Sequence, residues 1–260
     1  MIFNLLALLF PAWRPHFALL DTALANEMMA LRWLHLIFGI IWIGLLYFFN
    51  LVLTPAMKNC DPKLRIKIYP ELMPGAMGWF RSSALVTVIV GLRYFTIHLA
   101  ADAKLAGDRS LIGKWFGWWL LVWVVAYVFI YALQLPSKGI LDIPGVRAIA
   151  VSIVVIAASW LVLASNGGPT VSNAHLAISV GGGLGLVMLL NTWGVVWSVQ
   201  KRLIAWARTS AAQGVPMPPE ADRLMRWNYL TARTSFWLSF PMLFFMGAAS
   251  HYPFLSSVAR

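Results

Sequence analysis

Four histidines lie within or at the ends of long apolar stretches of this chain: His35, His98, His175 and His251. An ionisable side chain inside a lipid-length helix is costly, so it is expected to face the protein interior and to have a function. Neutral imidazole is the commonest metal-binding side chain. The four histidines therefore indicate haem or metal ligation. The alternative for each is a hydrogen bond to a neighbouring helix, or an interfacial position near headgroups and helix ends.

Composition places these histidines in a membrane protein. The chain has 260 residues, of which 60% are hydrophobic and 11% charged, against about 25% charged in a typical soluble domain. Several apolar stretches exceed the roughly 20 residues that cross a bilayer. We expect an all-α, polytopic membrane helix bundle of about six transmembrane helices, at residues 27–53, 76–100, 112–133, 146–165, 172–199 and 229–250.

The apolar N-terminal segment, residues 1–26, is broken by Pro11, Arg14 and Pro15. It is interpreted as a retained interfacial or re-entrant segment that precedes a single transmembrane helical domain at 27–260. Basic loops are expected after the first span and between the fifth and sixth spans, at 201–226.

The net charge of +11 is explained by basic loops facing an anionic cytoplasmic leaflet, so no nucleic-acid partner is needed. Of the 20 Lys and Arg residues, 13 fall on one side of the expected topology. The other seven are Arg14, Arg32, Arg93, Lys104, Arg109, Lys114 and Arg260. The positive-inside rule then predicts that both termini face outward. In a bacterial inner membrane, that side is the periplasm.

The four histidines in or at the ends of the expected spans all fall on the outer side of this topology. The first, second, fifth and sixth spans are therefore predicted to form a four-helix arrangement with one histidine on each wall, as cofactor sites in bundles are built. No Asp or Glu falls inside the expected spans except Glu27 at a boundary, which disfavours a carboxylate-bridged metal site. Porphyrin propionates would need cations, and Arg32 and Arg93 lie near His35 and His98; the alternative for both is snorkelling to headgroups.

The expected cofactor is one or two non-covalent b-type haems. The only cysteine is Cys60, and no C-x-x-C-H motif for covalent haem is present. Four histidines allow two bis-histidine haems, one such haem plus a separate metal, or one haem with spare histidines. His35, on the order of 10 Å inside its helix, is expected to be the deepest ligand. The glycine run at 181–185 is interpreted as helix packing.

Two end motifs resemble one family. They are Trp33-Leu-His35 with Gly39, Trp42-Ile-Gly44, Tyr47, Asn50 and Thr54-Pro-Ala56, and Pro241-Met-Leu-Phe-Phe-Met246 with His251-Tyr-Pro253. Together with Trp79-Phe-Arg81, they resemble the membrane domain of cytochrome c-type urate oxidases (urate hydroxylases). The resemblance covers about residues 30–253. The first helix is also similar to those of membrane protoporphyrinogen oxidases and copper-resistance membrane proteins.

The resemblance implies a urate-oxidising membrane module, a urate hydroxylase-type oxidoreductase. A cytochrome c domain commonly follows the membrane part in that family, so a separate cytochrome c or a quinone is expected to accept the electrons. The other expected partners are membrane lipids and further copies of the chain in a homo-oligomer. A different function class also fits the histidines: copper or haem transport or assembly without catalysis, with Met242 and Met246 near His251 as soft copper ligands.

Overall fold

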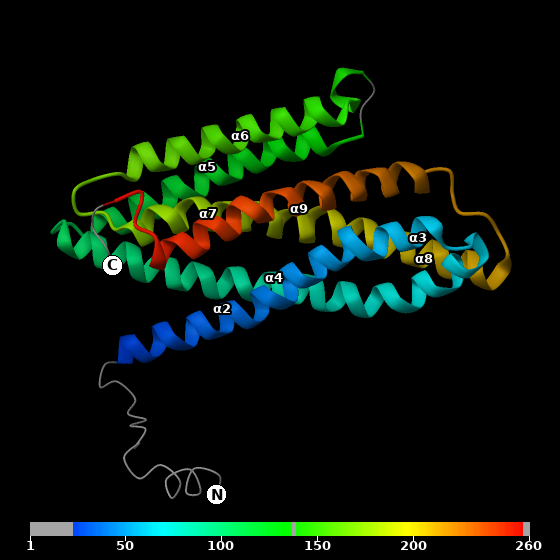
Figure 1. Cartoon of the computed structure of the whole chain (residues 1–260), viewed down its shortest axis with the longest axis horizontal. Helices are drawn as coiled ribbons and strands as arrows, with labels where there is room; N and C mark the ends of the chain where they lie inside the picture. Colours follow the sequence, from blue (N-terminus) through cyan, green and yellow to red (C-terminus); the bar gives the residue numbers. More distant parts are fainter. Residues whose placement is uncertain (1–22, 137–138, 257–260) are drawn as a thin grey trace, which may run out of the picture.

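Six helical rods run side by side along the long axis of the molecule (Figure 1). The structure is a computed structural model that describes residues 23–136 and 139–256, apart from the side chains of residues 63 and 144. No strand occurs in these described ranges, so the expected all-α helix bundle is confirmed. The N-terminal segment lies outside them up to residue 22, and residues 23–26 already belong to the first helix.

The rods consist of the following elements in chain order: α2 (Ala23–Tyr47), continued by the π-helical turn η1 (Phe48–Leu53) and α3 (Thr54–Asn59); α4 (Pro62–Leu105); α5 (Ser110–Gln134); the short 3-10 turn η2 (Ile140–Asp142) and α6 (Pro144–Asn166); α7 (Asn173–Leu190), continued by the π-helical turn η3 (Asn191–Val196) and α8 (Trp197–Gln213); and α9 (Ala221–His251).

Five of these rods are long and apolar enough to cross a membrane. The sixth, α9, belongs to the same bundle because it is hydrogen-bonded to the start of α7 and to the turn η3 that continues α7. The side-chain amide of Asn173 donates to the carbonyls of Ala248 and Ala249, at 3.1 and 3.2 Å. That of Asn191 donates to the Ser235 hydroxyl at 3.0 Å. The chain is therefore a membrane protein of six associated helical rods.

Several helix boundaries lie outside the expected ranges. The second rod, α4, has 44 residues and continues through Pro70 and Pro74, so the basic residues expected in a loop before it are helical. At 1.5 Å per residue, this helix is about 66 Å long, more than twice the roughly 30 Å of a hydrocarbon core. Likewise, residues 201–213 of the expected second basic loop belong to α8, and only 214–220 connect it to α9.

Helix α7 lies at the centre of the bundle, and 15 of its 18 residues are buried. Small residues on its surface let neighbouring helices come close. The indole of Trp123, from α5, covers Gly183 so tightly that a β-carbon there would lie 1.9 Å from the ring. Phe245 and Met246, from α9, lie against Gly181. The glycine run is thus used for helix packing, as expected.

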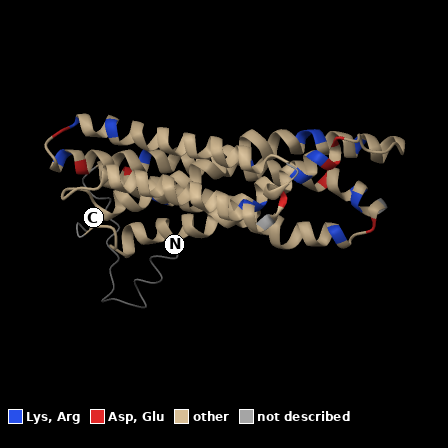
Figure 2. Ribbon diagram, turned by 90° about the horizontal axis from the view of Figure 1, so that it is seen from above, with Lys and Arg blue, Asp and Glu red and all other residues tan. Residues whose placement is uncertain are grey.

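The first residues of α2 and the last residues of α9 lie at the same end of the bundle (Figure 1). We call this the terminal end. The turns from α4 to α5 and from α6 to α7 lie there too. The opposite end carries the connections from α3 to α4, α5 to α6 and α8 to α9, and most of the Lys and Arg residues gather toward it (Figure 2). We call this the basic end.

Candidate functional site

A buried carboxylate–imidazole pair joins α4 to α7 at the terminal end. Oδ2 of Asp102 lies 3.0 Å from Nδ1 of His175, and both residues are at most 1% exposed. The same oxygen accepts hydrogen bonds from the backbone N–H and the hydroxyl of Ser172, each at 2.9 Å. Ser172 also caps α7, because its hydroxyl accepts from the backbone N–H of His175 at 3.2 Å. Three contacts thus fix one carboxylate and the first turn of α7.

The imidazole of His175 is enclosed by aromatic rings. Trp115, from α5, lies edge-on with its ring centre at 5.0 Å, and Phe95, from α4, does so at 5.9 Å. Because Asp102 occupies Nδ1, the other ring nitrogen, Nε2, is the one free to bind a further group. That atom is buried and has no hydrogen-bond partner among the described residues. An imidazole fixed at Nδ1 by a carboxylate is the arrangement that orients a metal-ligating histidine.

His98 provides a second buried Nε2 atom without a described partner. It lies on α4 four residues before Asp102, so the two side chains share one helix face. Its ring makes an edge contact with Tyr94, with the ring centres 4.8 Å apart. His98 and Asp102 thus lie on one face of α4, and Asp102 is hydrogen-bonded to His175, the other histidine with an unpartnered nitrogen.

Arg32, from α2, lies at the outer edge of the group formed by Tyr94, His98, Asp102 and His175, which we call the His98 cluster. Its guanidinium donates a hydrogen bond of 2.7 Å to the Tyr94 hydroxyl and lies 5.7 Å from the centre of that ring. Arg93 is arranged differently. Two of its nitrogens donate to the carboxylate of Glu27, at 2.7 and 3.0 Å, on the exposed surface between α2 and α4. Of the two arginines, Arg32 is thus the one linked to the His98 cluster, whereas Arg93 already has an anionic partner.

His35 lies deeper in the bundle, at the contact between α2 and α4. Its Nδ1 is 2.9 Å from the carbonyl oxygen of Thr87. Its ring lies so close to Gly91 that a β-carbon there would be 2.9 Å from Cε1. Gly91 precedes His98 by seven residues, or about 10 Å along α4. His35 is therefore a separate histidine position, further from the terminal end than His98.

His251 is the last residue of α9 and is exposed. The four histidines thus occupy the expected end of the bundle but differ in depth and surroundings. Within the described ranges, no three His, Cys, Asp or Glu side chains gather in positions that would hold one metal ion. The chain accordingly provides a histidine pair around Asp102, the deeper His35 and a peripheral His251.

The expectation that no carboxylate lies inside the spans was wrong. Asp102 follows the expected end of the second span by two residues, but α4 continues to Leu105 and packs against the start of α7. Burial of this carboxylate is possible because Ser172 and His175 supply hydrogen-bond donors to it. The spacing of His98 and Asp102, at positions i and i+4 of a helix, is a sequence signal that places these two side chains on one face, but it does not indicate His175 as the partner of Asp102.

The two methionines proposed as soft copper ligands lie in packed positions. Met242 is buried, and Met246 lies against Gly181 on α7. Both therefore help α9 to pack on α7.

Comparison of the chain with protein-family models, with curated proteins and with solved structures finds no match.

Proposed function

We propose that this chain is an integral-membrane b-type haem protein that transfers electrons. The observation that carries the proposal is the pair of buried Nε2 atoms on His98 and His175, neither with a described partner. The carboxylate of Asp102 also fixes the ring of His175. A buried polar atom without a partner costs about 1–3 kcal/mol, so a ligand that binds it offsets a real penalty.

The donor set fits haem better than a metal ion held by the protein alone. Haem iron takes four ligands from the porphyrin and needs only one or two from the chain, and histidine is a usual axial ligand. A zinc or copper centre built from side chains needs three or more ligands, and no such group occurs in the described ranges. Bound haem would supply one-electron redox chemistry at this end of the bundle.

The chain's own residues have distinct parts in this proposal. His98 and His175 would hold the haem iron, and Asp102 would orient His175 and increase its basicity. Arg32, at the outer edge of the cluster, is the cation available to a propionate. Trp115 and Phe95 keep water away from His175. Burial and hydrogen bonding of this kind are the means by which a protein sets a haem potential.

The finer part of the proposal follows from the resemblance to urate hydroxylases. We propose a bacterial inner-membrane location with both termini in the periplasm. There, the chain would pass electrons from urate to a separate cytochrome c or a quinone. The terminal end of the bundle would then face the periplasm, where a soluble cytochrome could reach the His98 cluster.

The decisive experiment uses the full chain purified after expression with adequate haem. Reduced-minus-oxidised spectra and a pyridine haemochrome assay are expected to give a b-type signal of at least one haem per chain. Elemental analysis is expected to find iron in the same ratio. No b-type signal would reject the proposal. Stoichiometric copper with little iron would instead support the copper-handling alternative. Urate-dependent reduction of added cytochrome c tests the substrate separately.

A further inference from the structure

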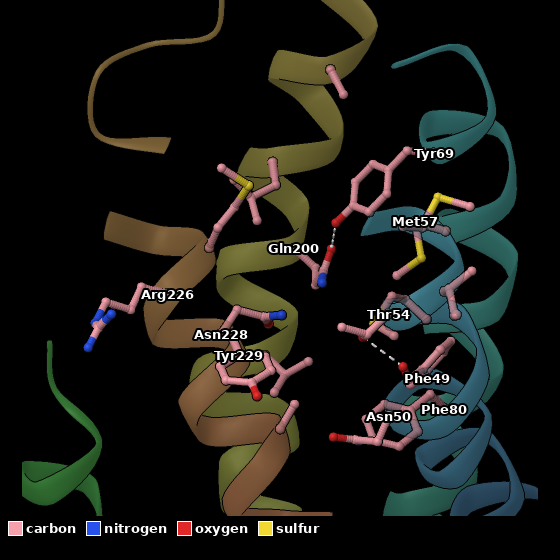
Figure 3. A pocket seen from close by; sticks show the side chains of 18 of the residues that line it. Phe49, Asn50, Thr54, Met57, Tyr69, Phe80, Gln200, Arg226, Asn228 and Tyr229 are labelled. Carbon is pink, nitrogen blue, oxygen red and sulfur yellow. Dashed lines mark hydrogen bonds between the residues drawn. The ribbon is translucent and has the colours of Figure 1, made fainter. Parts of the chain in front are cut away.

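A cavity of about 690 Å³ lies toward the basic end of the bundle, away from the histidines. It separates η1, α3 and the first half of α4 on one side from α8 and the start of α9 on the other (Figure 3). Its volume is within the 300–1,000 Å³ of small-molecule sites. None of the residues proposed to bind haem lines it.

Both π-helical turns of the described chain line this cavity. Phe49 and Asn50 come from η1, and Thr192 and Val196 come from η3. A π turn contains an extra residue that widens the helix and changes where its side chains point, and such turns are frequent at functional sites. Here the two π-helical turns lie on different rods and line the same cavity. The helical backbone thus departs from α-helical geometry on two sides of the cavity.

The walls of the cavity are apolar and adaptable. Five of the 11 methionines line it: Met57, Met73, Met77, Met217 and Met225. Methionine is unbranched and flexible, and surfaces rich in it accept apolar groups of variable shape. Phe49 and Phe80 add aromatic surface to the same space. Such walls suit a flexible hydrocarbon chain.

The charged groups at the cavity are basic. Lys58, Arg65 and Arg226 are among its described lining residues, and no Asp or Glu is. Arg226 points away from the gap (Figure 3) and is bonded to Asp142. Lys58 and Arg65 form no ion pair with a described carboxylate. Lys58 lies 5.8 Å from the ring centre of Tyr229, and Arg65 donates to the carbonyl of Met57 at 3.3 Å. These two cations are available for an anion.

Polar groups also project into the cavity. Tyr69 donates a hydrogen bond to the side-chain oxygen of Gln200 across it, from α4 to α8 (Figure 3). The amide of Asn228 points into the gap (Figure 3), and its Oδ1 atom is buried without a described partner. A buried polar atom without a partner is able to accept a hydrogen bond from a ligand or a water molecule.

We propose that this cavity binds an anionic amphiphile. Its acyl chain lies along the methionine walls, and its acidic head lies between Lys58 and Arg65. The shared chemistry is a carboxylate or phosphate on a hydrocarbon chain, supplied by a free fatty acid or by an acidic phospholipid. The site is independent of haem binding. The basic end is also where the positive-inside rule places an anionic leaflet.

The first test uses cis-parinaric acid, a fluorescent fatty acid, and its uncharged methyl ester. The full chain is placed in phosphatidylcholine nanodiscs, with empty nanodiscs as the background. We expect saturable binding of one acid per chain, and about tenfold weaker binding of the ester, which lacks the charge-assisted contacts. Displacement by dioleoyl phosphatidylglycerol would identify a phospholipid as the source, and displacement by oleate alone a free fatty acid. Binding no greater than in empty nanodiscs, or equal binding of acid and ester, would overturn the proposal.

Variants test where the probe binds. The double variant Lys58→Gln/Arg65→Gln is expected to weaken binding of the acid about tenfold. The double variant Lys104→Gln/Arg109→Gln, which removes two charges at the terminal end, is expected to leave it unchanged. Ala232→Phe fills the cavity from α9 and should abolish binding of acid and ester alike. Size-exclusion profiles identify folded protein. Wild-type affinity in folded Lys58→Gln/Arg65→Gln or Ala232→Phe would show that the probe binds elsewhere.

Discussion

Nδ1 of His175 lies 3.0 Å from Oδ2 of Asp102, although the two residues are separated by 73 positions in the chain. The contact joins the end of α4 to the start of α7, and the other ring nitrogen of His175 has no described partner. If that nitrogen binds haem iron, the carboxylate acts on the iron through the imidazole.

Replacing either member of this pair is expected to reduce haem binding. His175→Ala removes the proposed ligand and should abolish most of the b-type absorbance. Asp102→Asn removes the charge that orients the ring, and loss of such a partner typically lowers affinity about 10- to 100-fold. Asp108→Asn, at the exposed turn between α4 and α5, is the matched control and should retain full haem. Haem content is measured by the pyridine haemochrome assay on membranes matched for protein level. Equal haem in all three variants would contradict ligation by His175.

His35 is a candidate ligand for a second haem, separate from the one proposed at His98 and His175. Its Nδ1 is held by the carbonyl of Thr87, which leaves Nε2 as the nitrogen that can ligate. We expect His35→Ala to lose the b-type absorbance of this second haem while the protein still inserts. Leu36→Ala changes the neighbouring residue, which is exposed on α2, and should have no effect. Full haem retention in His35→Ala would mean that this histidine only packs α2 against α4.

Two glycines on α7 should respond differently to the same substitution. A β-carbon at Gly183 would lie 1.9 Å from the buried ring of Trp123, whereas one at Gly185 would meet nothing within 4 Å. Overpacking of this kind costs about 1–3 kcal/mol. We therefore expect Gly183→Ala to lower the thermal unfolding temperature in detergent and Gly185→Ala to leave it unchanged or raise it. Equal unfolding temperatures for the two variants would show that α5 can move away from α7 at little cost.

The orientation of the bundle is testable with reporter fusions. Because 13 of the 20 basic residues were assigned to the side opposite the termini, a reporter fused after Arg260 should face the periplasm. Alkaline phosphatase is expected to be active there and inactive when inserted after Gln213, in the connection from α8 to α9. The reverse pattern would place the His98 cluster on the cytoplasmic side.

The number of rods and their order were predictable because apolar length is a local property of the sequence. The start of α4 was not. Pro70, Pro74 and the charged residues before them are usual signals of a loop, yet the helix continues through them. Proline removes a helical hydrogen bond, and a contact with α8, the hydrogen bond from Tyr69 to Gln200, supports the helix in this region.

The histidines could be found from sequence, but their grouping could not. Asp102 was missed because hydropathy falls before the helix ends, and its partner comes from a distant helix. The cavity is a clearer example of a feature that could not be predicted from sequence. Tyr69 and Gln200, which meet across it, are 131 positions apart, and the π turns beside them have no recognised local motif. Both features arise from how the rods pack.

The enclosure of α7 has a consequence for biosynthesis. The chain leaves the ribosome from its N-terminus, so α7 enters the membrane before α9 exists. During that interval the side-chain amides of Asn173 and Asn191 lack the α9 groups that later bond to them, and polar groups in hydrocarbon are costly. The nascent bundle is thus incomplete until its last helix arrives. A chain that terminates in the connection at 214–220 would therefore be a substrate for membrane quality control.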